Sequence, residues 1–246
     1  QSQENREKVK QNVVLKHEVV VTATRLETPI KEVASSITVI TRQELELSRK
    51  TSVLEALEEV IGVYVIQNGP KGGAASAFLR GANSEHTLVM MDGVELNDPI
   101  SPSRSFDLAH LALEGIERIE VLRGPQSTLY GSEALGGVIN IITRKGQGKP
   151  KFHLSTEGGS YRTFSTIAGI SGGSNWVDYS LGISRLQTQG FSAASESYGG
   201  NKENDGYQNL SLSGRVGFRL KNNIDFELAA RNLKTETEVD NFGGPY

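Results

Sequence analysis

Cysteine is absent from the 246 residues of this chain. That absence excludes disulfide frameworks, cysteine-ligated zinc, iron–sulfur clusters and cysteine nucleophiles. No apolar run approaches the roughly 18 residues that a membrane-spanning helix needs, so a membrane role would be peripheral or would use a β-barrel. The polar N-terminus lacks the apolar core of a signal peptide, and an exported protein would therefore have lost its signal already.

Charge of one sign and catalytic motifs are also scarce. The 26 basic and 29 acidic residues give a net charge of −3, which argues against a non-specific nucleic-acid binder. The four histidines are scattered and match no metalloprotease or hydrolase motif. We therefore expect no nucleic-acid partner, no enzymatic activity and no required cofactor.

The hydrophobic pattern changes near Lys145, where a Gly/Pro stretch at 146–150 separates two parts. Helix and strand signals alternate before this point, and only strand and turn signals follow it. We expect a flexible segment at 1–17, an α+β domain at 18–145 and about five antiparallel strands at 146–246.

Short-range signals predict the elements of the first part. Capping boxes that start at Thr41 and Ser52 predict two short helices, and a third helix is expected at 106–113. Asp92-Gly93 is a hairpin turn signal between strands at 87–91 and 94–96. Further strands are expected at 36–40, 63–67, 78–80, 116–122 and 138–142.

Apolar residues alternate with polar ones in the second part, as in the run from Val177 to Ile183. Such a face packs in the core of a soluble sandwich or contacts lipid in a transmembrane barrel. Charged and small residues on the opposite face, and connections that are alternately short and long, favour lipid contact. Both interpretations remain open at this level.

Three long strings resemble the plug domain of TonB-dependent outer-membrane receptors. They are EVVVTATR at 18–25, LRGANSEHTLVMMDGVELND at 79–98 and IERIEVLRGPQSTLYGSEALGGVINIITRK at 116–145. Within that family, the chain is most similar to cobalamin (vitamin B12) receptors of the BtuB type, through QNG at 67–69, SEHTLVMMDGVELN and NDGY at 204–207.

The resemblance implies an α+β plug domain followed by the first antiparallel strands of a transmembrane β-barrel, incomplete in this chain. In the family a plug fills a 22-stranded barrel, and TonB, with its inner-membrane energising complex, drives import of a nutrient. It implies a monomer in the bacterial outer membrane, in contact with its lipid, with the N-terminal side of the plug facing the periplasm. Because a barrel must close in lipid, we expect a protein more than twice as long.

The resemblance also assigns binding segments. Six residues align with the Ton box that engages TonB, where a β-prone segment suits strand addition; the alternative is a plain first plug strand. These residues are Glu18, Val19, Val20, Val21, Thr22 and Ala23. Two loops, at 68–76 and 98–105, are expected to face the ligand through Asn68, Gly69, Lys71, Asp98, Ser101, Ser103, Arg104 and Ser105.

The resemblance also implies a plug–barrel latch and a calcium site, both formed mainly by charged residues. Arg80 and Arg123, each followed by glycine, are expected to latch the plug to barrel carboxylates. A calcium site is possible at Glu203, Asn204, Asp205 and Asp240, because calcium takes hard oxygen ligands in flexible loops; a generic turn is the alternative.

Active import of cobalamin is thus the leading functional hypothesis. A ferric-siderophore or haem receptor is the alternative within the family. A stand-alone soluble binding or signalling module is the alternative of another class, but five strands with two open edges would be prone to aggregation.

Overall fold

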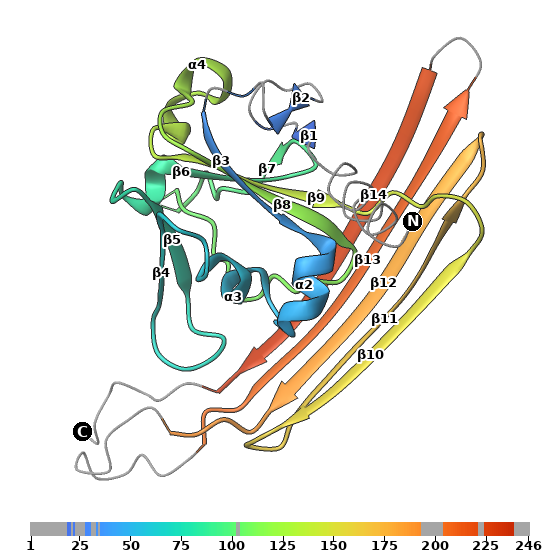
Figure 1. Cartoon of the computed structure of the whole chain (residues 1–246). Helices are drawn as coiled ribbons and strands as arrows, with labels where there is room; N and C mark the ends of the chain where they lie inside the picture. The colour runs from blue at the N-terminus through green and yellow to red at the C-terminus, as the bar shows by residue number, and fades with distance from the viewer. Residues whose placement is uncertain are drawn as a thin grey trace, which may run out of the picture.

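The computed structural model describes residues 19–20, 22, 28–30, 33, 35–101, 104–192, 204–220 and 224–238. Within these ranges an N-terminal α+β domain lies against a sheet of five long strands (Figure 1). None of the described helices is long and apolar enough to span a bilayer.

A mixed five-stranded sheet forms the centre of the N-terminal domain, in the order β3-β8-β9-β6-β7. Its strands are β3 (Ser36–Thr41), β6 (Thr87–Met91), β7 (Val94–Glu95), β8 (Ile116–Arg123) and β9 (Gly137–Thr143). Only the β6–β9 pair of this sheet is parallel. Two small ladders accompany it, formed by β1 (Val19–Val20) with β2 (Thr28–Pro29) and by β4 (Val63–Gln67) with β5 (Ala75–Leu79).

Short helices cover the sheet, and the alternation of its strands supplies a core on each face. One core contains Leu57, Ile119 and Ile139, and the other contains Leu122 and Val138. The helical elements are α2 (Arg42–Ser48), α3 (Val53–Leu57), η2 (Ser84–His86), α4 (Ser127–Tyr130) and η3 (Ser132–Ala134).

The helix expected at 106–113 is wrong. This segment is irregular because its backbone bonds to distant elements. Leu108 N donates to Ala75 O at 3.1 Å, and Leu111 O accepts from Val53 N at 2.8 Å. Ala112 also forms an isolated bridge with Ser52. These tertiary hydrogen bonds use groups that a helix would have paired internally.

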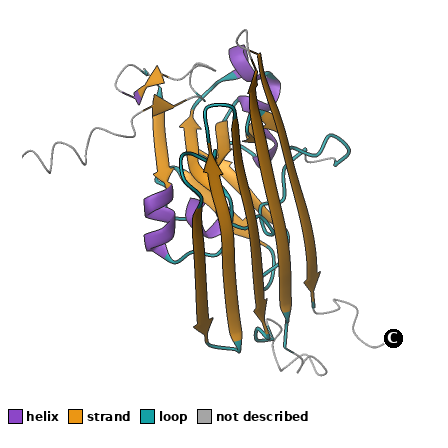
Figure 2. Cartoon of the chain, turned by 90° about the vertical axis from the view of Figure 1, so that its right-hand side faces the viewer, coloured by secondary structure: helices purple, strands orange, loops and turns teal. Residues whose placement is uncertain are grey.

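The second part is an antiparallel sheet whose five strands are neighbours in sequence order (Figure 2). We call this sheet the wall. Its strands contain 9 to 14 residues, and about 9 to 11 suffice to cross a bilayer at a tilt. They are β10 (Lys151–Gly159), β11 (Thr163–Gly173), β12 (Val177–Thr188), β13 (Tyr207–Leu220) and β14 (Ile224–Thr237).

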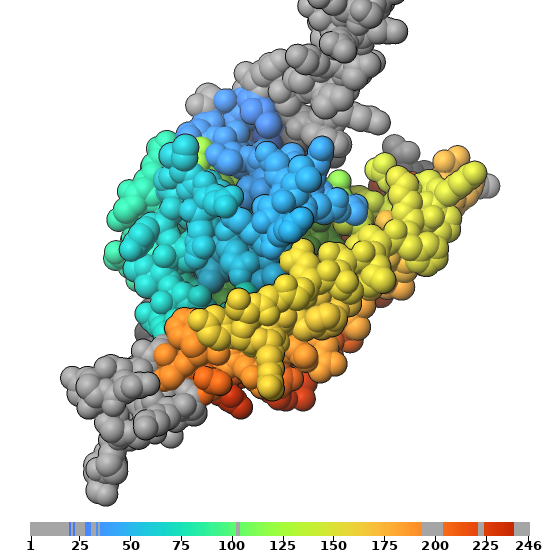
Figure 3. Space-filling view, turned by 60° about the horizontal axis from the view of Figure 1, so that its bottom comes forward, coloured from blue at the N-terminus to red at the C-terminus, as the bar shows by residue number. Residues whose placement is uncertain are grey.

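The two faces of the wall decide between the soluble and the membrane interpretation. Apolar side chains point away from the molecule, with Phe152 79% and Leu154 73% exposed. Small polar and charged side chains such as Ser211 and Arg215 are buried against the N-terminal domain, which sits directly on the wall (Figure 3). The polar face is therefore inside and the apolar face outside, as in antiparallel strands of a transmembrane barrel, and the soluble-sandwich alternative is wrong.

Candidate functional site

Thr22, a predicted Ton box residue, is completely buried in a polar socket on the N-terminal domain. Its backbone N donates to Glu120 Oε2 at 2.9 Å, and its Oγ1 donates to the same oxygen at 2.6 Å. Tyr130 OH donates to Thr22 O at 2.8 Å, and Asn140 Nδ2 donates to Thr22 Oγ1 at 3.1 Å. Every polar group of Thr22 is thereby hydrogen-bonded to the domain. We call the three partners, Glu120, Tyr130 and Asn140, the Thr22 socket.

The neighbouring Ton box residues are held by backbone pairing. Val19 pairs with Pro29 and Val20 with Thr28 in the β1–β2 ladder, and the Val20 side chain is fully buried. Glu18, Val21 and Ala23 lie outside the described residues. In this arrangement β1 already has a strand partner, and Thr22 is bonded to the domain. Pairing with another protein would therefore compete with these contacts.

The loop at 68–73 lies between β4 and β5 and is held by a side-chain contact of Lys71 and a backbone hydrogen bond of Asn68. Lys71 Nζ lies 2.7 Å from Glu55 Oε1 and 3.1 Å from Thr51 Oγ1. Burial tends to raise the pKa of Glu55, but the charge of Lys71 and the hydrogen bonds from Lys71 and Thr51 outweigh it and lower that pKa below its ordinary value. Asn68 N donates to Ala74 O at 2.9 Å across the loop.

This loop also touches the end of the wall that carries the long 189–206 connection. Gly72 has φ +94°, and a Cβ there would lie 2.4 Å from the Tyr207 ring and 2.7 Å from Thr237 Oγ1. The neighbouring Gly69 has open space around it. Figure 1 shows the β4–β5 hairpin pointing away from the end of the domain that carries β1 and β2.

The second predicted ligand loop is stabilised by Asn97. Its Oδ1 accepts from Val89 N at 2.8 Å, and its Nδ2 donates to Arg104 O at 2.9 Å. Arg104 Nη1 lies 3.2 Å from Glu133 Oε1, and Asp98 Oδ1 accepts from Ile100 N at 2.9 Å. Ser101 and Ser105 are described within this segment, whereas Ser103 lies outside the described residues.

The two predicted latch arginines lie close to each other. A Cβ at Gly124 would lie 3.2 Å from Arg80 Nη1. The pKa of Arg123 is lowered, first by burial and then by the charge of Arg80. Arg123 donates to Ile61 O at 2.6 Å and to Ser36 Oγ at 3.2 Å. Across the described ranges neither arginine has an acidic partner, and the barrel latch remains a prediction.

Other ionic contacts join the domain to the wall, with carboxylates on the domain and arginines on the wall, the reverse of the predicted latch. The sequence analysis missed these contacts. Glu114, fully buried, lies 2.7 Å from Arg231 Nη1 of β14 and accepts from Ser184 Oγ of β12 at 3.1 Å. Ser211 Oγ of β13 donates to the same carboxylate. A single domain carboxylate thus contacts three neighbouring wall strands.

Asp92 makes the second such contact. Arg215 Nη1 of β13 lies 3.3 Å from Asp92 Oδ1 and donates to Thr143 Oγ1 at 2.7 Å, while its Nη2 lies 2.6 Å from Glu227 of β14. Together Asp92, Glu114, Arg215 and Arg231 are named the wall clamp. Arg215 and Arg231 occupy the polar positions of alternating strands, and these inward-facing arginines were the available sequence signal.

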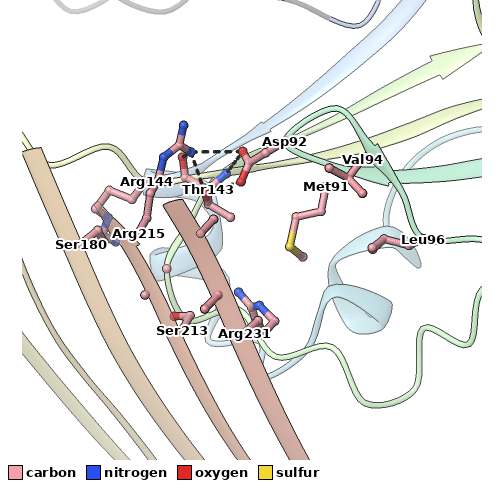
Figure 4. A pocket seen from close by; sticks show the side chains of 14 residues that line it. Met91, Asp92, Val94, Leu96, Thr143, Arg144, Ser180, Ser213, Arg215 and Arg231 are labelled. Carbon is pink, nitrogen blue, oxygen red and sulfur yellow. Dashed lines mark hydrogen bonds and ion pairs between the residues drawn. The ribbon is translucent and has the colours of Figure 1, made fainter. Parts of the chain in front are cut away.

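A cavity of about 200 Å³ lies at this seam, bounded by Asp92 and Met91 of the domain and by Ser213 and Arg215 of the wall (Figure 4). Figure 4 shows Asp92, Thr143 and Arg215 facing one another, with Arg231 on the adjacent strand. Arg144, also at the cavity, has its pKa lowered to about 10, first by burial and then by the charge of Arg42.

The predicted calcium site is only partly described. Glu203 and Asp240 lie outside the described residues, while Asn204 precedes the buried Asp205 at the start of β13. Gly206 N donates to Glu238 Oε2 at 3.3 Å in the same region. Among the described residues, no group of three or more His, Cys, Asp or Glu side chains is arranged to hold a metal ion. The site stays a prediction.

Comparison with known proteins gives consistent matches. A family model described as TonB-dependent Receptor Plug Domain matches residues 29–138. The chain is 35% identical over 232 residues to the vitamin B12 transporter BtuB of Photobacterium profundum, covering 93% of this chain and 37% of that protein. It is 34% identical over 245 residues to the vitamin B12 transporter BtuB of Vibrio vulnificus, covering 96% and 38%.

A solved structure agrees with these matches. The siderophore receptor PirA from Acinetobacter baumannii superposes with a TM-score of 0.62 at 27% identity, covering 82% of this chain and 32% of that chain. This chain therefore spans well under half the length of the relatives it matches.

Proposed function

This chain belongs to the TonB-dependent receptor family, and we propose that its parent protein imports a scarce nutrient across the bacterial outer membrane. One observation carries the proposal: the plug domain occupies the polar side of a transmembrane wall while Val19, Val20 and Thr22 are held on the plug. A domain in that place blocks the lumen. A receptor of this kind must therefore rearrange its plug before substrate can pass.

The proposed partner on the periplasmic side is TonB. The outer membrane has no ATP and no proton gradient of its own, so the energy for plug rearrangement must arrive through a protein that reaches the inner membrane. Val19 and Val20 are extended, as strand addition requires, and a TonB strand would compete with β2 for them. The proposal places Glu18 to Ala23 at this contact and the plug's N-terminal side in the periplasm.

Cobalamin is the proposed substrate, because both BtuB relatives are vitamin B12 transporters. The 68–73 loop supports a ligand-facing role, since Lys71 is held by Glu55 and the loop lies at the end of the wall that carries its long connection. A ferric siderophore is the second candidate, favoured by the likeness to PirA, a siderophore receptor. We propose no catalytic role.

Calcium is proposed as an optional ligand of the 203–205 and 240 segments. Oxygen ligands from two loops would order the outer ends of β12 to β14, where Asp205 is 2% exposed. If calcium neither protects these loops from proteolysis nor changes substrate affinity, the calcium proposal is wrong.

Equilibrium binding to the intact parent receptor in detergent tests the substrate proposal. Cobalamin and a ferric siderophore are compared, each with and without calcium, and uptake is then measured in cells with and without TonB. Tight cobalamin binding with TonB-dependent uptake is expected. Binding of the siderophore but not of cobalamin would change the proposed substrate to a siderophore. Uptake that does not depend on TonB would refute the transport mechanism.

A further inference from the structure

The wall clamp holds the plug at one end of strand β8. Glu114 precedes β8 by two residues, and Arg123 is its last residue. Seven steps of about 3.3 Å separate Ile116 from Arg123, or roughly 23 Å. The ionic contacts with β12 to β14 and the arginine pair Arg80–Arg123 are therefore at opposite ends of the plug sheet.

We propose that the wall clamp makes β12 to β14 the fixed side of the gate, so that the plug stays seated on these strands while substrate passes along another face. This inference rests on the proposed transport function. Glu114 and Arg231 act in it as positioning residues that bind no substrate.

Burial at the clamp is the first argument. The Glu114 side chain is fully buried, and the Arg215 and Arg231 side chains are 7% and 17% exposed. Withdrawing the plug from this wall would break the ion pairs to Arg215 and Arg231 and the hydrogen bonds from Ser184 and Ser211 at the same time.

Close backbone approach is the second argument. A Cβ at Gly115 would lie 2.8 Å from Ser213 Oγ, and a Cβ at Gly182 would lie 3.4 Å from Glu114 Cγ. The adjoining cavity of about 200 Å³ is smaller than the roughly 300–1,000 Å³ of pockets that hold drug-sized ligands. The plug is therefore closely packed on β12 to β14, whereas a larger cavity of about 380 Å³ opens beside Gly115 toward β10 and β11.

A disulfide across the seam tests the proposal, and the absence of cysteine from this chain makes the engineered pair easy to follow. Cβ atoms at positions 115 and 213 would lie 3.7 Å apart, within the range of about 3.5–4.5 Å for disulfides. Gly115→Cys with Ser213→Cys in the full receptor would therefore join plug and wall covalently when oxidised, and dithiothreitol would release them.

The expected result is that oxidised and reduced receptors import substrate at rates within about twofold of each other. A loss of more than roughly tenfold on oxidation, with substrate binding unchanged and import restored by dithiothreitol, would overturn the proposal. A positive control, Val20→Cys with Thr28→Cys, joins paired residues of β1 and β2 and is expected to block import when oxidised.

Gly115 has φ +71°, so a cysteine there strains the backbone. The oxidised and reduced forms of the Gly115→Cys with Ser213→Cys receptor carry the same backbone strain, so their ratio cancels it, and substrate binding by the reduced form shows that the variant is folded. Reduced receptors report on the proposed function separately. If their uptake does not depend on TonB, the transport proposal fails, whereas a loss on oxidation alone refutes only the fixed wall.

Discussion

Replacing Thr22 with valine removes one hydroxyl from a buried socket and keeps the shape of the side chain. The hydroxyl donates to Glu120 Oε2 at 2.6 Å and accepts from Asn140. A hydrogen bond to a charged group contributes ~1.5–3 kcal/mol. We take about 2 kcal/mol for Thr22→Val, which is roughly a 30-fold change in the equilibrium between bound and released segment.

Spin-label spectroscopy measures this equilibrium, with the label on a single cysteine introduced as Val19→Cys. If about 1% of the segment is released in the ligand-free receptor, a population typical of minor states, Thr22→Val would raise that fraction to roughly a quarter. Binding of TonB to the ligand-free receptor should rise in parallel.

Thr22→Ser is the matched control, because it keeps the hydroxyl and loses only a methyl group. The two variants should therefore differ in spin-label mobility, with serine close to the parent. Equal behaviour of valine and serine, or a valine variant whose segment stays fully immobile, would refute the argument that the Thr22 socket holds the segment.

Three further predictions concern the N-terminal strand and the ligand loops. Val20→Pro removes a ladder N–H and should abolish TonB-dependent uptake while ligand affinity stays unchanged; loss of both would contradict the Ton box assignment. The pKa of Glu55 is lowered in the folded state. The ionised carboxylate therefore stabilises the folded protein above its unfolded pKa of about 4.5, and this contribution is lost as the pH falls through its folded pKa. Lys71→Met should therefore lower the melting temperature at pH 7, and by progressively less as the pH is lowered below about 4.5, with Lys149→Met as control. Gly72→Ala places a Cβ 2.4 Å from the Tyr207 ring at φ +94° and should weaken substrate binding several-fold; unchanged affinity would exclude this loop from the ligand face.

Local signals predicted the elements whose interactions are local. Thr41 N donates to Glu44 Oε2 at 2.7 Å, and Glu44 N donates to Thr41 Oγ1 at 3.4 Å, so this capping box is confirmed. Asp92 and Gly93 both have positive φ, as the predicted hairpin requires. Interactions within three or four residues can be read from the order of the residues alone.

The second capping box was only half right, for a tertiary reason. Glu55 N donates to Ser52 Oγ at 3.3 Å, but the Glu55 carboxylate accepts from Thr51 and Lys71 instead of closing the box on Ser52. Thr51 is the residue just before the expected partner, but Lys71 is 16 residues away and adds a charged contact to the same carboxylate. Local spacing cannot reveal such a competitor.

The wall clamp could not be predicted from the sequence either, because its paired residues lie even farther apart along the chain. Glu114 meets Arg231 across 117 positions, and Asp92 meets Arg215 across 123. Alternation did assign both arginines to the polar face of their strands. Choosing their partners required the seating of the plug, which depends on the close approach at Gly115 and Gly182.

Strand order within the plug constrains how the protein folds. The β3–β8 ladder pairs Ser36 with Arg123, and the parallel β6–β9 ladder pairs Thr87 with Gly137, whereas each wall strand pairs with its neighbour in sequence. Closing long loops costs entropy before the contacts form, so such pairings are slow. The central plug sheet cannot be completed until β8 and β9 have been synthesised, and a chain cut after β7 would leave β3 without its partner and β6 paired only with β7. The plug sheet therefore forms as one unit once β9 is present, whereas each wall strand can pair with the strand before it.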